Sequence, residues 1–344
     1  MSEKKIFEDM IEDVVDNDLC VSCGTCVAVC PVDVIELKNE VPNLVGKCIE
    51  CGLCYSNCPR TDFEKGEMDK IVFDRERREY ENLTGVYESV YQAKTKVKDI
   101  GEKAQDGGVV SSILKQFINE SGEGAIVAGL SEKMPWVPKP LIAKNESDII
   151  EAAGTKYTSS PTILGLKEAV KNQDLKSVAV VGTPCQMRGL TKLTKGKLKN
   201  RKYDDAVKLK IGLFCMETFR YDDWIDYLKG NNVNPSEVTK FEIKNGRFYA
   251  KKGDEVLHKA KLSKVKKLVR PCCHQCDDFS SEYADISVGN VGSPGGWSTV
   301  IARTERGQKI LFAAERADLI TLKPIEGFNK QETLVHKLAK LKKS

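Results

Sequence analysis

The chain of 344 residues lacks the features that mark several large classes of protein. No segment approaches the roughly 18 consecutive apolar residues that a transmembrane helix requires. The N-terminal segment MSEKKIFEDMIEDVVD is rich in charge and has no apolar core of the kind that a signal peptide carries. The net charge of +4 is too small to indicate nucleic-acid binding. These absences predict a cytoplasmic protein with no nucleic-acid partner and no direct membrane insertion.

Three common functional motifs are also missing. The sequence contains no G-x-G-x-x-G, no P-loop and no H-E-x-x-H. A standard Rossmann site, a P-loop nucleotidase and a zincin hydrolase are therefore excluded. The basic C-terminal segment HKLAKLKKS, residues 336–344, has the composition of a solvated helix end rather than of a binding arm.

Cysteine is abundant, and eight of the thirteen cysteines stand in two runs. The runs CVSCGTCVAVCP, from Cys20, and CIECGLCYSNCP, from Cys48, share the spacing Cys-x2-Cys-x2-Cys-x3-Cys-Pro. This is the bacterial ferredoxin pattern, in which three cysteines of a run bind one 4Fe–4S cluster and the fourth binds the other. Zinc is the alternative, but zinc sites usually present separated ligand pairs. The pattern assigns Cys20, Cys23, Cys26 and Cys58 to one cluster (cluster I) and Cys30, Cys48, Cys51 and Cys54 to the other (cluster II).

The sequence divides into three parts. Residues 1–60 form the predicted double-cluster ferredoxin domain, and residues 61–86 form a charged linker that we expect to be exposed and at most partly helical. In residues 87–344 short apolar β runs alternate with helical segments, which favours an α/β core with a largely parallel or mixed sheet. The expected strands are 86–93, 124–130, 177–183, 207–215 and 284–290, and the expected helices are 107–120, 162–171 and 222–230.

The remaining five cysteines lie in this core. Cys185 follows one expected strand, Cys215 closes another, and Cys272, Cys273 and Cys276 stand together in RPCCHQCDDF. Ligands gather at strand ends in open α/β sheets, so two strand-end thiols and a Cys-x-x-Cys pair would form a four-thiolate site. The spacing leaves open whether Cys272 or Cys273 pairs with Cys276. Buried structural cysteines and a zinc site are the other interpretations.

The core from about residue 91 to residue 323 resembles the beta subunits of the coenzyme F(420)-reducing hydrogenases and their relatives. The resemblance rests on AQDGGVVSSIL, AAGTKYTSSP, GTPCQMRGL, GLFCMETF, CHQCDDF and ADISVGNVGSPGGWSTVIART, in this order. In that family the core binds FAD and a single 4Fe–4S cluster. The resemblance therefore implies a third cluster held by Cys185, Cys215, Cys273 and Cys276, and it gives Cys272 no counterpart.

The resemblance also implies flavin contacts in the glycine-rich segments. The glycines of QDGG would let the amides of a helix N-terminus approach a phosphate, Lys156 would supply a cation, and the segment 288–304 would lie near the isoalloxazine and the incoming deazaflavin. The alternatives are a plain turn at QDGG, a solvated Lys156 and a core position for Trp297. No catalytic general base is expected, because the cofactors carry the chemistry. The implied residues are Gln105, Gly107, Gly108, Ser111, Gly154, Thr155, Lys156, Tyr157, Ser159, Thr183, Gly292, Ser293 and Trp297.

A double-ferredoxin domain ahead of such a core resembles the layout of the F(420)H(2) dehydrogenase members of the family in methanogenic archaea. It implies an enzyme that oxidises reduced coenzyme F(420) by hydride transfer to FAD and passes single electrons through 4Fe–4S clusters. The acceptor would be a membrane-bound dehydrogenase complex, with this chain peripheral on its cytoplasmic face, or soluble ferredoxin. A fused sulfite reductase shares the layout, but the chain ends without a siroheme half, which disfavours it. The alternatives are an F(420)-reducing subunit of a hydrogenase, formate dehydrogenase or sulfite reductase system, a flavoenzyme with another substrate, and a non-enzymatic electron carrier.

Overall fold

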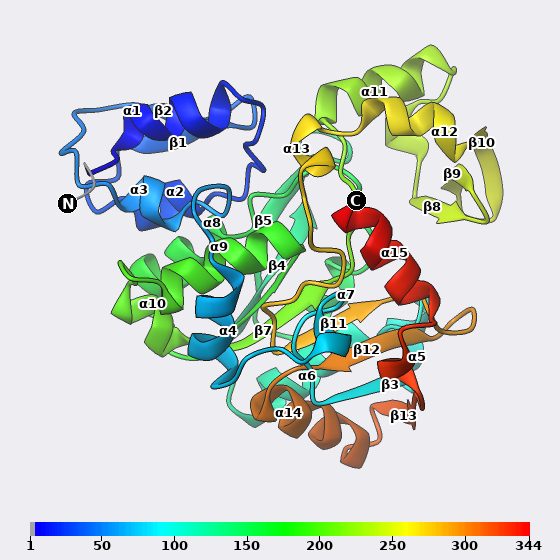
Figure 1. The fold of residues 1–344 in the computed structure, drawn as a ribbon. Helices are drawn as coiled ribbons and strands as arrows, with labels where there is room; N and C mark the ends of the chain where they lie inside the picture. Colours follow the sequence, from blue (N-terminus) through cyan, green and yellow to red (C-terminus); the bar gives the residue numbers. More distant parts are fainter. Residues whose placement is uncertain (1–3) are drawn as a thin grey trace.

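Eight strands of the core form one mixed sheet in the computed structural model, which describes residues 4–344 (Figure 1). Four neighbouring central strands, β11, β7, β6 and β4, run parallel, and antiparallel strands flank them on both sides. This arrangement confirms the predicted mixed sheet. In spatial order the strands are β13 (Ile320–Pro324), β3 (Ser89–Thr95), β12 (Ser298–Ala302), β11 (Ile286–Gly289), β7 (Val207–Leu213), β6 (Val178–Gly182), β4 (Gly124–Leu130) and β5 (Pro138–Ala143).

The central strands are apolar because helices cover the sheet on both faces. All five residues of β6, VAVVG, are buried, as is typical of a parallel strand that contacts helices on each side. The five expected strands and the three expected helices are all present, whereas β5, β12 and β13 were not anticipated. One face carries α5 (Lys98–Lys103), α6 (Val109–Glu120), α7 (Glu146–Glu151) and α14 (Glu305–Arg316), and the other carries α8 (Leu164–Lys167) with η3 (Glu168–Asn172), α9 (Pro184–Lys195) and α10 (Arg201–Ala206).

The N-terminal domain packs directly against α8 and α9 (Figure 1). Cys23 and Ala28 of this domain belong to the same buried apolar cluster as Ile163 and Met187 of the core. The domain and the core are therefore joined by a shared hydrophobic interior. Its elements are α1 (Phe7–Met10), η1 (Ile11–Val15), α2 (Thr25–Val29), β1 (Ile35–Lys38), β2 (Val41–Leu44) and α3 (Leu53–Asn57).

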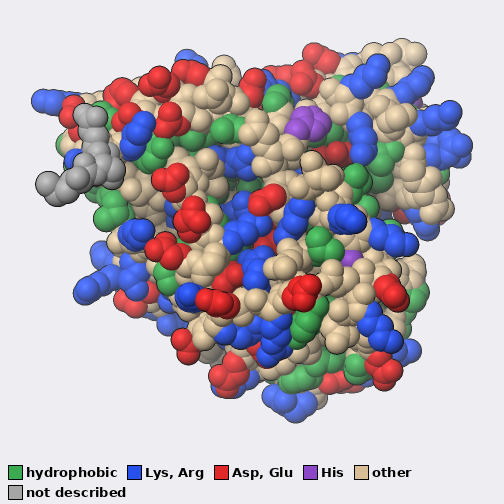
Figure 2. All heavy atoms as spheres, in the orientation of Figure 1, with side chains coloured by type: hydrophobic (Ala, Val, Ile, Leu, Met, Phe, Trp, Pro, Cys, Tyr) green, Lys and Arg blue, Asp and Glu red, His purple; other side chains and the backbone are tan. Residues whose placement is uncertain are grey.

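A small antiparallel sheet lies between β7 and β11 in the chain and was not anticipated. Trp224 of α11 is almost fully buried and packs against Phe241 and Phe248 of this sheet. Figure 2 shows lysine and arginine side chains gathered over this part of the molecule, at the upper right. The elements are α11 (Tyr221–Gly230), η4 (Pro235–Glu237), β8 (Lys240–Lys244), β9 (Arg247–Lys252), β10 (Glu255–Lys261), α12 (Leu262–Val265) and η5 (Lys266–Leu268).

The segment 61–86 is partly helical, as expected, and many of its residues are exposed, but part of it is packed into the fold. It contains α4 (Lys65–Phe73) and η2 (Glu79–Glu81), and two of its carboxylates are buried. Arg77 binds Asp69 through Nε and Nη2 at 2.6 and 2.9 Å, and Arg75 binds Glu81 with two contacts of 2.7 Å. Two buried carboxylates of this segment therefore pair with its own arginines.

The C-terminal segment forms α15 (Leu334–Lys343), which follows η6 (Phe328–Lys330). A helix was expected here, but its end is not simply solvated: Lys343 Nζ contacts the buried Glu282 carboxylate at 2.9 Å, and Lys342 also points inward. Near this helix end lies α13 (Pro271–His274), which carries the core Cys-x-x-Cys pair. Within residues 4–344 no helix has the length and apolar character needed to cross a membrane.

Candidate iron–sulfur and flavin sites

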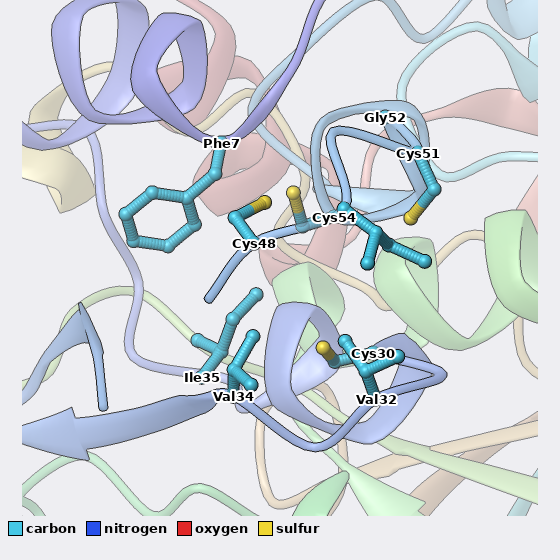
Figure 3. Close-up of a pocket in the computed structure, with 10 residues that line it drawn as sticks. Phe7, Cys30, Val32, Val34, Ile35, Cys48, Cys51, Gly52 and Cys54 are labelled. Atoms are coloured by element: carbon cyan, nitrogen blue, oxygen red, sulfur yellow. The ribbon is translucent and has the colours of Figure 1, made fainter. Parts of the chain in front are cut away.

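The four predicted ligands of cluster II, Cys30, Cys48, Cys51 and Cys54, line one cavity (Figure 3). Cys30 follows α2, whereas the other three come from the loop before α3 and from α3 itself. Cys30 faces those three across the cavity, so the structure brings together the crossed set that the ferredoxin pattern predicts. The rest of the lining is mostly apolar and includes Phe7, Val32, Val34, Ile35 and Ile49.

The four predicted ligands of cluster I, Cys20, Cys23, Cys26 and Cys58, line a second cavity. Burial, together with the neighbouring Cys58 and Cys20, raises the pKa of the Cys23 thiol to about 12. Thiolates crowded in this way repel one another, and iron cations between them would remove that cost. The donor set and its surroundings therefore fit a cluster.

Glycines in the two cysteine runs are required by the backbone. Gly24 and Gly52 precede α2 and α3 with φ of +84° and +76°, in the left-handed region. A Cβ at Gly24 would lie 2.7 Å from Leu164 Cγ, and one at Gly52 would lie 2.6 Å from the Lys5 carbonyl oxygen. Glycine thus permits both the turn between the ligands and the close packing behind it.

Four cysteines of the core meet beyond the carboxyl ends of β6 and β7. Cys185 lies in the first turn of α9, Cys215 follows β7, Cys273 lies in α13 and Cys276 follows it. Burial raises the pKa of Cys185 to about 12, with Cys276 and Cys273 adding to the effect, and burial and the other three thiols raise the pKa of Cys215. The structure thus brings together the set that the family resemblance implies.

Cys272 lies next to this group. It is buried, and its hydrogen bond with Cys273 raises the pKa of Cys272 and lowers that of Cys273. Cys185 is also near enough to add to the rise in the pKa of Cys272. The assignment of Cys272 as a spare thiol stays a prediction.

A single-ion site is the alternative to a cluster at the cysteine groups. Among residues 4–344, no three His, Cys, Asp or Glu side chains converge closely enough to hold one metal ion. A cubane inserts iron and sulfide between its thiolates, so it needs ligands that are grouped but further apart than those of one zinc ion.

The three cysteine groups follow one another in space. Cys23 of the cluster I site is close enough to Cys185 of the core group to raise its pKa. Cys54 of the cluster II site likewise adds to the rise in the pKa of Cys26, which belongs to the cluster I site. The cluster I site therefore lies between the core group and the cluster II site.

Arg270 connects the segment of the core pair to the cluster I site. Its guanidinium is 5 % exposed and donates to the carbonyl oxygen of Cys20 at 3.0 Å and to Ser22 Oγ at 2.7 Å. The same group pairs with Glu40 at 3.1 Å. One side chain of the core thus binds the start of the first cysteine run and, through Glu40, the segment that follows it.

Two lysines reach the backbone of predicted ligands. Lys192 of α9 donates from Nζ to the carbonyl oxygen of Cys58 at 2.8 Å, and burial lowers its pKa to about 8. Lys342 of α15 donates to the carbonyl oxygen of Cys273 at 2.7 Å. Sequence reasoning missed Arg270, Lys192 and Lys342, because their residue types and local patterns resemble those of surface cations.

Several segments implied as flavin contacts converge beside β8. Gln105 Nε2 donates to the carbonyl oxygen of Phe241 at 3.3 Å, and Asp106 forms a hydrogen bond with Asn290, which precedes Gly292. Burial raises the pKa of Asp106, which in turn adds to the rise in the pKa of Tyr157. The segments 105–108, 154–157 and 290–297 therefore border one region, and Asp106 and Asn290 were not anticipated.

Lys156 holds its ammonium group among backbone carbonyls. Nζ donates to Ala152, and to Ala153 and Gly154 at 3.2 Å each, and burial lowers its pKa to about 8. None of these acceptors carries a charge, so the ammonium group would gain from a nearby phosphate. Lys156 is therefore not the solvated surface charge that was the alternative interpretation.

Other implied flavin residues have contacts within the protein. Ser159 Oγ donates to the carbonyl oxygen of Val21 in the N-terminal domain at 3.1 Å, and Thr183 Oγ1 lies 3.2 Å from Cys185 Sγ. A Cβ at Gly107 would lie 2.7 Å from Ser298 N, so packing alone requires that glycine. Trp297 is partly exposed, with Lys323 Nζ 4.8 Å from its ring centroid. Three of the remaining glycines, Gly108, Gly154 and Gly292, have positive φ angles of +68°, +86° and +91°. Ser293 Oγ lies 2.7 Å from Thr299 Oγ1. Ser111 and Thr155 are half-buried.

Comparisons with known proteins match nearly all of this arrangement. Residues 90–167 and 175–327 match the family described as coenzyme F(420) hydrogenase/dehydrogenase, beta subunit, through its N-terminal and C-terminal parts. The coenzyme F(420) hydrogenase subunit beta of Methanothermobacter thermautotrophicus is 36% identical over 263 residues, which cover 76% of this chain and 93% of that protein. This chain belongs to the family of coenzyme F(420) hydrogenase/dehydrogenase beta subunits. Residues 12–60 match the 4Fe–4S dicluster domain, which confirms the ferredoxin-like N-terminal domain.

Members of the family with longer matches differ in their surroundings. A subunit of the F(420)H(2) dehydrogenase of Methanosarcina mazei is 32% identical over 317 residues, covering 87% of this chain and 83% of that protein. The coenzyme F(420)-dependent sulfite reductase of Methanocaldococcus jannaschii is 36% identical over 336 residues, covering 93% of this chain but 50% of that protein. A chain in the solved F(420)-reducing NiFe hydrogenase complex of Methanosarcina barkeri aligns with a TM-score of 0.71 and 37% identity, over 76% of this chain and 90% of its own. Membership of the family supports an oxidoreductase role with electron transfer through 4Fe–4S clusters.

Proposed function

We propose that the chain oxidises reduced coenzyme F(420) by hydride transfer to FAD and delivers the electrons singly through three 4Fe–4S clusters to an acceptor. The observation that carries the proposal is the order of the sites. The core cysteines Cys185 and Cys215 lie in the same domain as the segments implied as flavin contacts, and the cluster I site separates them from the cluster II site. Electron transfer between one-electron centres needs such a series of neighbouring sites.

The chain's own residues have distinct roles in this proposal. Lys156 would neutralise phosphate charge of the flavin cofactor, and the positive-φ Gly108 and Gly292 would let backbone approach it. Arg270 would hold the first cysteine loop at a fixed distance from the core group. When bound, FAD supplies the step from two-electron hydride chemistry to the one-electron chemistry that the clusters carry out. The protein supplies position and electrostatics.

The acceptor follows from the relatives. Proteins similar to this chain are named as subunits of an F(420)H(2) dehydrogenase and of F(420) hydrogenases, so we infer that a partner in a multi-subunit complex receives the electrons. A membrane-bound complex and soluble ferredoxin both fit this role. The chain would then lie in the cytoplasm or on the cytoplasmic face of such a complex.

A second candidate uses the same sites in the opposite direction. Two relatives at 36% and 38% identity are named as hydrogenase beta subunits, which favours reduction of F(420) by electrons arriving from a partner. The sites are the same in both cases, and the potentials of donor and acceptor decide the direction.

The proposal is tested by anaerobic flavin and iron analysis followed by mixing with reduced F(420). We expect one FAD and about twelve iron per chain, from three cubanes. Reduced F(420) should bleach the flavin quickly, whereas NADH and NADPH should not, because the chain lacks the dinucleotide fingerprint. Comparable bleaching by NADH would refute the choice of substrate, and absence of bound flavin would favour a non-enzymatic electron carrier.

A further inference from the structure

Lys192 is a buried cation whose hydrogen-bond acceptors are all uncharged. Its residue is 8 % exposed, and Nζ donates to the carbonyl oxygen of Cys58 at 2.8 Å, to Thr61 Oγ1 at 2.7 Å and to the carbonyl oxygen of Asp62 at 3.0 Å. These bonds use all three ammonium protons, yet none goes to a carboxylate. Buried charges in proteins are normally paired with an opposite charge, but here the Asp62 carboxylate only opposes the lowering of the Lys192 pKa from a distance and forms no ion pair with it.

Lys342 makes a similar contact at the core cysteines, although it is half-buried rather than buried. Its Nζ donates to the carbonyl oxygens of Met216 and of Cys273, the latter at 2.7 Å. Burial raises the pKa of Cys215 and of Cys276, and the Lys342 ammonium opposes the rise in both. Glu217 is near enough for Lys342 to lower its pKa, but no ion pair between them forms. Both acceptors of Lys342 are uncharged carbonyl oxygens, so the ammonium group lies near the predicted thiolates without a carboxylate among these partners.

Lys171 shows the contrasting case at the cluster II site. Its Nζ approaches the carbonyl oxygen of Cys30 at 3.4 Å, in the same relation to a predicted ligand. However, Asp33 lies 3.8 Å from Lys171 and also pairs with Lys167 at 2.7 Å. The Lys171 side chain is also more exposed than Lys192, at 26 %. Its charge is therefore compensated within the protein and screened by water.

We propose that Lys192 and Lys342 are the counter-charges of cluster I and of the core cluster, and that each raises the reduction potential of its cluster. A 4Fe–4S cluster with four thiolate ligands carries net negative charge, which grows on reduction, so a fixed cation beside it favours the reduced state. Such a cation acts most strongly where water is excluded. Within residues 4–344 the cluster II site has no buried lysine of this kind, because Lys171 is paired with Asp33 and Lys4, whose side chain lies near Gly52, is exposed. For Lys342 the inference rests on the proposed function, which includes the core cluster. For Lys192 it rests only on the dicluster domain that holds cluster I.

The test is an anaerobic redox titration of the full-length holoprotein followed by electron paramagnetic resonance. Lys192→Gln keeps a hydrogen-bond donor but removes the charge, and Lys192→Arg keeps the charge; Lys342 is changed in the same two ways. We expect each Gln variant to lower the midpoint potential of a different single cluster, with about a tenfold change in its reduction equilibrium, or 59 mV for one electron. The Arg variants should stay near the parent potentials, and Lys171→Gln should change its cluster less than threefold.

Iron content separates the remaining outcomes. Loss of about four iron from a Gln variant but not from the matching Arg variant would support the proposal, since the charge is then needed to hold the cluster. Equal potentials in the Gln and Arg variants, or equal iron loss from both, would overturn it and leave a structural hydrogen bond. A shift in Lys171→Gln as large as that in Lys192→Gln would also overturn it. If the parent protein holds only about eight iron, it has no core cluster and that part of the proposed function is wrong. The role of Lys192 can still be tested in that case, because cluster I belongs to the N-terminal domain.

Discussion

The substitution Gly189→Ala tests how closely the N-terminal domain is held against the core. Gly189 lies in the middle of α9, and a Cβ there would lie 2.5 Å from Thr25 Oγ1 and 3.6 Å from Pro59. Thr25 is fully buried and contacts Cys23 Sγ at 3.2 Å, so it cannot move without disturbing the cluster I site. Overpacking of this kind costs about 1–3 kcal/mol, whereas alanine in a helix interior gains about 0.8–1.0 kcal/mol over glycine.

Gly66→Ala is the matched control, because Gly66 lies in the helix α4 with nothing within 4 Å of its Cβ position. Subtracting the change in unfolding free energy of Gly66→Ala from that of Gly189→Ala removes most of the gain in helix propensity. The remaining difference is the cost of overpacking and should be about 1–3 kcal/mol. At matched scan rate, the anaerobic holoprotein with Gly189→Ala should unfold a few degrees below the control, since about 1 kcal/mol corresponds to about 2–4 °C in domains of 150–250 residues. Adding Thr25→Ala should recover part of this loss, a non-additive effect between contacting residues. Equal unfolding temperatures for Gly189→Ala and Gly66→Ala would refute this packing.

Three further predictions concern the redox sites. Cys273→Ser or Cys276→Ser should lose about four iron and Cys272→Ser none; an equal loss from Cys272→Ser would reverse the choice of ligand. Cys51→Ser, at the site furthest from the core group, should leave flavin bleaching by reduced F(420) intact but stop delivery to the protein acceptor, and full-rate delivery would place the exit elsewhere. A single substitution is preferable to deleting residues 1–60, because the deletion would expose the apolar surface that the N-terminal domain shares with α9. Burial lowers the pKa of Lys156 to about 8, so its cation is present below that pH and lost above it. Flavin dissociation, measured by fluorescence, should therefore increase between pH 7 and pH 9 in the parent but not in Lys156→Met, and a flat profile in the parent would contradict a phosphate contact.

Features with local spacing were predictable from the sequence. The two cysteine runs place three ligands within a few residues, so the crossed assignment needed no tertiary information. The strand β6 was evident because a short run of buried apolar residues is typical of a central parallel strand. In contrast, β8, β9 and β10 contain many lysines and cover a small core of their own, so their apolar runs are short and interrupted.

Contacts between distant residues were not predictable in this way. Lys192 and Cys58 are 134 positions apart, and nothing near Lys192 in the sequence distinguishes it from Lys195 of the same helix, which is exposed. The buried pairs in residues 61–86 misled for a related reason: Arg77 and Asp69 have the composition of an exposed segment, and only their mutual hydrogen bonds make burial possible. The family resemblance supplied the core cysteines that spacing alone left open.

The packing of the N-terminal domain on α9 also constrains how the protein matures. Cys23 and Cys58 are 7 % and 8 % exposed, and Gly189, Lys192 and Arg270 of the core close around the loops that carry them. An iron–sulfur delivery protein needs access to these thiols, and the docked core restricts it, since only Cys20 and Cys26 of the site stay partly exposed. A cluster at this site would therefore be easier to insert before the N-terminal domain docks on the core than after it.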